Sequence, residues 1–147
     1  MKDYTWIEMM EKMQDIRLFA TMNVRHAKKE GITSAQEMDM LSRIVLSKDA
    51  LTPQHLALQM GLSKSAVSRL IDHLEKKGFL QREYRPTDKR SYCLRITELG
   101  NSELDQTYRY YLEPVYRLRE TLGAARFETL TQNIKEANHL LQTETRR

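Results

Sequence analysis

The sequence has few of the residues on which several classes of protein depend. Its 147 residues include one cysteine, Cys93, so no disulfide can link two parts of the chain. Without a second cysteine to resolve a sulfenic acid, a quiet half-buried thiol is favoured over a redox switch. No apolar run approaches the ~20 residues of a membrane-spanning helix, and the first residues lack the cleavage site of a signal peptide. We therefore expect a cytoplasmic protein, in a reducing compartment, with no membrane partner.

The patterns that carry catalysis are also missing. The sequence has no glycine-rich phosphate loop, no nucleophile elbow and no pair of acids in a suitable context. Its four histidines lie far apart, and no cysteine-rich cluster accompanies them, so a metal sensor has weak support. We expect no catalytic residue, no metal and no cofactor, and we predict that the protein is not an enzyme.

Positive charge is concentrated in one part of the sequence. Between Gly61 and Ile96, nine Lys and Arg residues stand against four Asp and Glu, a net charge of +5. The rest of the chain has fifteen bases and sixteen acids, a net charge of −1. A local excess of positive charge is typical of a surface that binds nucleic-acid phosphates, although a solvated charged face can have the same composition.

Apolar residues recur at helical spacing through most of the chain. The first such run, which begins near residue 5, is expected to continue until Gly31 stops it. Ser34, with Glu37 three residues later, predicts a capping box at the start of a second helix. Pro53 opens a third helix, because the first helical position does not need the N–H that proline lacks. Ser63 then caps a fourth helix.

The period changes from helix to strand after the fourth helix. Residues 79–85 and 91–96 are short runs rich in aromatic and branched side chains, separated by a polar turn that contains a proline. A fifth helix follows, in which Pro114 should produce a kink or a break. A last helix begins after Gly123. The sequence thus predicts a mainly α fold of the α+β class: four helices, two strands and two helices.

Two short helices joined at Gly61, the second followed by a hairpin, form the pattern of a winged helix-turn-helix. The second of these helices is narrow enough to lie in the major groove of DNA. We expect its first turn to expose side chains that can hydrogen-bond to phosphates or base edges, namely Ser63, Lys64, Ser65, Ser68 and Arg69. Ser63 can equally serve as a helix cap, and Lys64 and Arg69 can simply be solvated.

The tip of the hairpin is the second candidate DNA contact. It carries Arg85, Asp88, Lys89 and Arg90. Arginine on such a wing can reach a neighbouring minor groove, where the potential is negative. Asp88 can orient one arginine through a charge-assisted hydrogen bond while another contacts DNA.

Three stretches of the sequence resemble the MarR family of transcriptional regulators. They are the recognition helix and its exit at 61–78, the wing with an Asp-x-Arg pattern at 85–90, and the return into the next helix at 96–100. The resemblance implies a homodimer built from the N- and C-terminal helices, with Arg90 in the minor groove and Asp88 ordering the wing. His73 stands where many members have arginine.

The resemblance divides the chain into three parts. Residues 1–33 form an N-terminal helix of the dimerisation region, 34–97 the winged helix-turn-helix domain, and 98–147 the C-terminal dimerisation helices. We expect a sequence-specific regulator that binds a pseudo-palindromic operator in double-stranded DNA, a repressor relieved by a small-molecule effector. The sequence does not identify residues that bind an effector.

A winged-helix module that binds another protein and not DNA is the alternative. Such a module more often has an apolar patch where this sequence has an exposed basic turn and Arg90, so the residues favour DNA.

Overall fold

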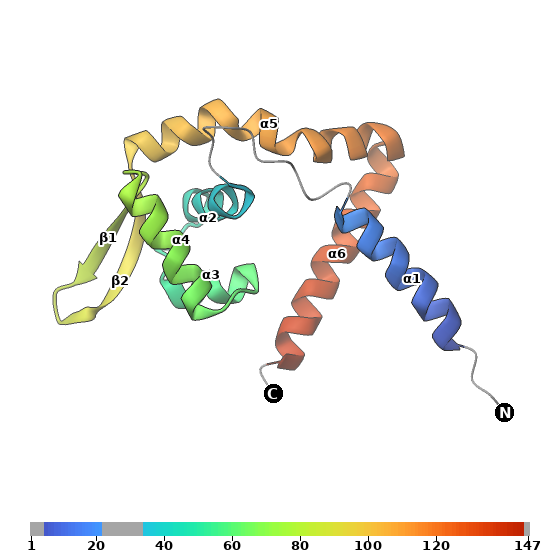
Figure 1. The fold of residues 1–147 in the computed structure, drawn as a ribbon, viewed down its shortest axis with the longest axis horizontal. Coiled ribbons are helices and arrows are strands. Elements are labelled where there is room, and N and C mark those ends of the chain that lie inside the picture. The colour runs from blue at the N-terminus through green and yellow to red at the C-terminus, as the bar shows by residue number, and fades with distance from the viewer. Residues whose placement is uncertain (1–4, 22–33, 146–147) are drawn as a thin grey trace. The chain divides into compact units, whose positions relative to one another are not determined.

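A computed structural model describes residues 5–21 and 34–145 of the chain (Figure 1). The chain divides into two compact units: a terminal unit, Met1–His26 with Leu112–Arg147, and a central unit, Ala27–Tyr111. The elements are α1 (Thr5–Phe19), α2 (Ala35–Leu46), α3 (Pro53–Met60), α4 (Lys64–Lys76), β1 (Leu80–Arg85), β2 (Asp88–Ile96), α5 (Glu98–Leu122) and α6 (Ala124–Thr145). This order confirms the predicted mainly helical fold with one hairpin. The predicted end of the first helix at Gly31 lies outside the described residues.

Side-chain caps start α2, α3 and α4. The hydroxyl oxygens of Ser34, Thr52 and Ser63 each accept a backbone N–H three residues later, at 3.2 Å. In α3 the box is complete, because the His55 imidazole also accepts the Thr52 N–H. The box predicted at Ser34 is only half formed: the Glu37 carboxylate hydrogen-bonds to Lys77 of the next-but-one helix instead.

The core of the central unit lies between α2, α3, α4 and the base of the hairpin. Gly61, with φ +65°, ends α3 in the left-handed conformation and lets α4 pack back against it. Helix α4 contributes one apolar face and keeps its other face polar. The most deeply buried side chains are Met40, Leu41, Leu56, Val67, Ile71, Leu74 and Leu80.

The hairpin is a two-stranded antiparallel sheet that extends further toward its tip than the sequence predicts. β2 begins at Asp88, three residues before the predicted start, and the turn is confined to Pro86 and Thr87. A register shift between Tyr84 and Arg85 lets Arg85 pair with Asp88 across this short turn. The basic residues of the tip are therefore held on paired strands and not on an open loop.

Helix α5 is not broken at Pro114. It continues from Glu98 to Leu122 with the proline inside. Of the two expected outcomes, a kink or a break, the break is therefore excluded. Proline removes only its own N–H from the hydrogen-bond ladder, at a cost of about 3 kcal/mol, and the flanking bonds of a 25-residue helix remain.

The terminal unit has no buried core of its own among its described residues. No residue of α6 is buried, and neither is any residue described in α1. Large apolar side chains are exposed on both helices, including Trp6, Ile16, Ile134, Leu140 and Leu141. In the described ranges, no helix combines the length and apolar character needed to cross a membrane.

Replacing Gly100 with alanine is expected to lower the free energy of unfolding by about 1–3 kcal/mol, the usual cost of overpacking. Gly100 is buried in the first turn of α5, where a Cβ would overlap the Phe79 carbonyl oxygen and lie 2.7 Å from Ile96. That oxygen is fixed because it accepts the Thr97 N–H at 3.0 Å. Urea denaturation measures the change. The exposed neighbour Asn101→Ala is the control, and equal stability of the two variants would contradict the packing argument.

Candidate nucleic-acid interface

The N-cap and the first two turns of α4 present a polar surface to solvent. Each of the five residues predicted to contact DNA there is exposed: Ser63, Lys64, Ser65, Ser68 and Arg69. On the opposite side of the helix, Val67 and Ile71 are fully buried in the core. Ser63 is indeed the N-cap, and its hydroxyl also hydrogen-bonds to that of Ser65 at 3.2 Å. Lys64 and Arg69 take part in no ion pair with the residues that the structure describes, so both charges are available.

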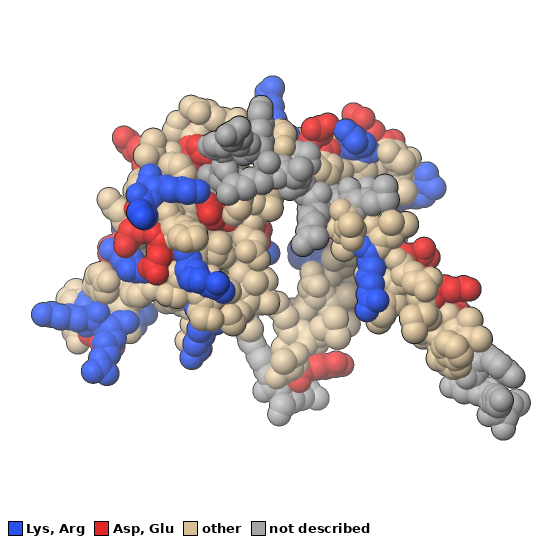
Figure 2. Space-filling view, in the orientation of Figure 1, with Lys and Arg blue, Asp and Glu red and all other residues tan. Residues whose placement is uncertain are grey.

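The wing carries its basic residues on an ordered tip. Arg85, Lys89 and Arg90 are exposed, and Lys and Arg side chains gather over this end of the hairpin at the lower left of Figure 2. One Asp88 carboxylate oxygen accepts the Arg90 backbone N–H at 2.9 Å, and the other accepts the Ser91 hydroxyl at 3.1 Å. Asp88 therefore holds the backbone of the tip, whereas the sequence predicted a bond to an arginine side chain.

A hollow of about 500 Å³ lies between the wing, the first turn of α4 and the start of α3. Three cations line it: Lys64, Arg85 and Arg90. The other lining residues are Thr52, Pro53, Gln54, His55, Ser91 and Tyr92. The N-terminus of a helix has backbone N–H groups and a partial positive charge that favour anions. The hollow thus has the charge and the donors to bind a phosphate group, and sequence reasoning missed the part that α3 contributes.

Comparison with known proteins points to the part of the chain that contains α4 and the wing. Residues 34–92 match the sequence model of the MarR family. Over this stretch the chain is similar to the MarR family. The HTH-type transcriptional regulator YkoM of Bacillus subtilis (strain 168) is 32% identical over 97 residues, 66% of this chain and 58% of that one. The transcriptional repressor MprA of Escherichia coli (strain K12) is 25% identical over 105 residues, 71% of this chain and 60% of that one. The chain therefore covers less than two thirds of the length of these two relatives.

Solved structures agree with the predicted winged-helix fold. A mutant MarR of Escherichia coli, complexed with operator DNA, is similar with a TM-score of 0.73 and 23% identity, over 92% of this chain and 99% of that one. The fold prediction is thereby confirmed. A family of transcriptional regulators is not a class of enzymes, and among the described residues no group of three His, Cys, Asp or Glu could hold a metal.

The wing is joined to α4 by a charged cluster that sequence reasoning missed. The guanidinium of Arg82 on β1 hydrogen-bonds to Asp72, lies 3.4 Å from the Glu75 carboxylate, and stacks over the Tyr92 ring at 5.2 Å. Burial alone would lower the pKa of Arg82, but the hydrogen bond to Asp72 and the charges of Tyr92, Glu75 and Asp72 raise it. The side chain stays charged and fixes the base of the wing to α4. Cys93, on the neighbouring strand, is half-buried.

Replacing Asp88 with alanine is expected to loosen the tip of the wing. The change removes the acceptor of the Arg90 N–H, and one hydrogen bond is worth about 1 kcal/mol, so this amide should exchange about fivefold faster. Hydrogen exchange followed by NMR measures the rate. Asp105→Ala, an exposed acid on α5, is the control. Unchanged exchange at Arg90 would show that Asp88 does not order the tip.

Proposed function

We propose that the protein is a transcriptional regulator that binds double-stranded DNA as a homodimer and represses its targets until a small-molecule effector releases it. The observation that carries this proposal is the exposed polar start of α4 beside an ordered basic wing, while the apolar side of α4 is buried in the core. The names of relatives support it, because MprA is a transcriptional repressor and the similar MarR structure contains operator DNA.

In this proposal α4 lies in the major groove and reads bases with its first two turns. Arg69 can bond to both acceptors on the edge of a guanine, while Ser65 and Ser68 can bond to bases or phosphates. The apolar side of α4 stays packed on the core during this contact, since it is already buried. Affinity comes mainly from Lys and Arg contacts to phosphate and therefore falls steeply with salt.

The hollow defined above gives the DNA backbone a place between the groove-reading helix and the wing. A phosphate there would meet Lys64 and Arg85 beside the N-terminus of α3, whose partial positive charge favours anions. Arg90, one residue beyond Lys89 on the tip, would reach into the adjacent minor groove. Asp88 serves this contact by holding the backbone from which Arg90 extends.

In the proposed dimer, a second copy of the chain covers the apolar side chains that the terminal unit exposes. Helices α1 and α6 expose large apolar side chains and have no buried residue among those described, so a partner must cover them to remove this surface from water. We assign residues 34–97 to DNA binding and the flanking parts, 1–33 and 98–147, to dimerisation. Two recognition helices about 34 Å apart would then match a pseudo-palindromic operator.

An effector would act on the distance between the two DNA-binding domains. A ligand shifts such an equilibrium only by its difference in affinity for the two spacings. Repression follows when the DNA-competent spacing is favoured without ligand, and release follows when the ligand favours the other.

The experiment is an electrophoretic mobility shift with the DNA upstream of the protein's own gene, at two salt concentrations. Selective binding that weakens as salt rises supports the proposal, and six to ten phosphate contacts would cost about 10³–10⁵ in affinity between 50 and 200 mM salt. Folded dimer that shifts neither this DNA nor a random-site pool would contradict it and favour a module that binds another protein.

A further inference from the structure

Glu37 on α2 is the only buried charged residue among those whose burial the structure describes. Its side chain is 8% exposed. A buried carboxylate is costly unless a cation and hydrogen bonds compensate it. No DNA contact assigned above explains this cost, since Glu37 lies on α2 and not on α4 or the wing.

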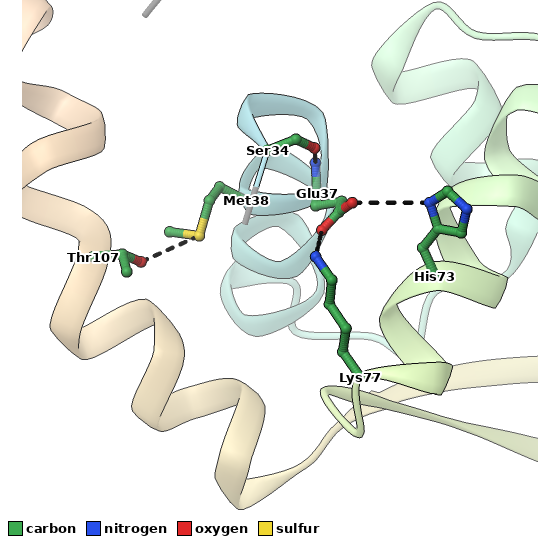
Figure 3. Close-up of polar contacts among 6 residues, drawn as sticks. All are labelled: Ser34, Glu37, Met38, His73, Lys77 and Thr107. Carbon is green, nitrogen blue, oxygen red and sulfur yellow. Dashed lines mark hydrogen bonds and ion pairs between the residues drawn. The ribbon is translucent and has the colours of Figure 1, made fainter. Parts of the chain in front are cut away.

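The compensation comes from the last turn of α4 (Figure 3). Lys77 Nζ donates to one Glu37 carboxylate oxygen at 2.6 Å, and His73 Nδ1 lies 4.0 Å from the other. Lys77 is the C-cap residue of α4, and His73 is one turn before it, so both lie on the same side of the helix. Glu37 therefore attaches the end of α4 to α2 across 40 residues of sequence.

Two further sets of contacts connect α4 and α2 to neighbouring elements. Arg82 holds the same half of α4 to the wing through Asp72 and Glu75. The residue after Glu37, Met38, accepts the Thr107 hydroxyl of α5 through its sulfur at 3.3 Å. The end of α4 is thus joined to α2 and β1, and α2 in turn contacts α5, whereas Lys64 and Arg69 at the start of α4 make no ion pair with described residues.

We infer that Glu37 is a positioning residue for operator recognition: it fixes the last turn of α4 so that the first turn meets the bases at the correct angle. This inference rests on the proposed function. A rigid helix pinned at one end presents its other end in one direction, and bidentate base contacts tolerate little change in that direction. Contacts to phosphate tolerate more, because they depend mainly on charge.

The test compares the affinities of variants for the operator and for random-sequence DNA. Glu37→Gln keeps the shape of the side chain and removes a negative charge, which by electrostatics alone should strengthen binding to any DNA. For the operator we expect the opposite: Glu37→Gln should bind it about tenfold more weakly, which is the effect of losing one base contact. Its affinity for random-sequence DNA should be unchanged or raised. Glu98→Gln, an exposed acid at the start of α5, is the matched control for charge.

A second pair of variants keeps the test decisive should Glu37→Gln not fold. Lys77→Gln and Lys76→Gln remove the same charge from neighbouring exposed positions, but only Lys77 contacts Glu37. We expect Lys77→Gln to bind the operator about tenfold more weakly than Lys76→Gln and random DNA equally well, and Lys77→Arg to restore the operator affinity.

Two results would overturn the inference, and they differ from failure of the proposed function. One is operator binding by Glu37→Gln that matches that of Glu98→Gln. The other is an equal loss on operator and random DNA, which indicates a smaller folded fraction and not a misdirected helix. Failure of the proposed function would show in the wild-type protein, which would then prefer no DNA sequence.

Discussion

Alanine at Arg69 or Arg90 is expected to weaken operator binding by about 10- to 100-fold, while the dimer stays folded. Arg69 is exposed on the second turn of α4, and Arg90 on the tip of the wing. Neither side chain forms an ion pair with the described residues, so its removal should cost little stability. A bidentate arginine–guanine contact is worth about 1–3 kcal/mol, and an arginine in a narrow minor groove is attracted by its negative potential.

The two arginines should differ in what they recognise. Arg69→Ala should also lose the preference for the guanine it reads, so that changing this base no longer matters, whereas Arg90→Ala should weaken binding more evenly across sequences. Fluorescence anisotropy with wild-type and base-substituted operators measures both effects. Arg117→Ala, an exposed arginine of the terminal unit, is the control for loss of charge. Wild-type affinity in both Arg69→Ala and Arg90→Ala would reject the assignment of α4 and the wing to DNA.

Glutamate at both Ile134 and Leu141 is expected to convert the dimer to monomer at micromolar concentration and to abolish operator binding. These residues lie seven apart on α6 and are 43% and 61% exposed in one chain. Burial of each such side chain contributes about 1.5–3 kcal/mol, and a symmetric interface contains each of them twice. A charge placed there would have to be buried without a partner, which is costly.

Light scattering coupled to gel filtration measures the mass of this double variant. Gln132→Glu adds one negative charge to α6, half that of the double variant, at an exposed position on the opposite side of the helix, and it should remain dimeric. A double variant that stays dimeric would place the interface elsewhere, and one that is monomeric yet binds the full operator would show that DNA recognition does not need the dimer.

Local signals in the sequence predicted most of the central unit. Ser34, Thr52 with Pro53, and Ser63 each start a helix, because a cap depends on residues only three positions apart. The apolar face of α4 follows from its spacing in the same way. The exposure of the five polar residues at the start of α4 was predictable too, because the buried side of a helix determines the exposed one.

Contacts between distant parts of the chain could not be predicted. The spacing of Ser34 and Glu37 predicted a local capping box, but the carboxylate of Glu37 binds Lys77, 40 residues away. Arg82 shows the same limit, since a charged residue on a wing strand gives no sign that Asp72 and Glu75 lie beside it. The contribution of α3 to the cationic hollow also depends on how three elements come together.

Selection from a pool of random double-stranded DNA by the full-length protein tests the central claim most directly. The account predicts enrichment of two inverted half-sites with centres about 10 bp, or one helical turn, apart, with a guanine at the position that loses its effect in Arg69→Ala. A folded dimer that enriches no sequence, or a single half-site without its inverted copy, would contradict the account.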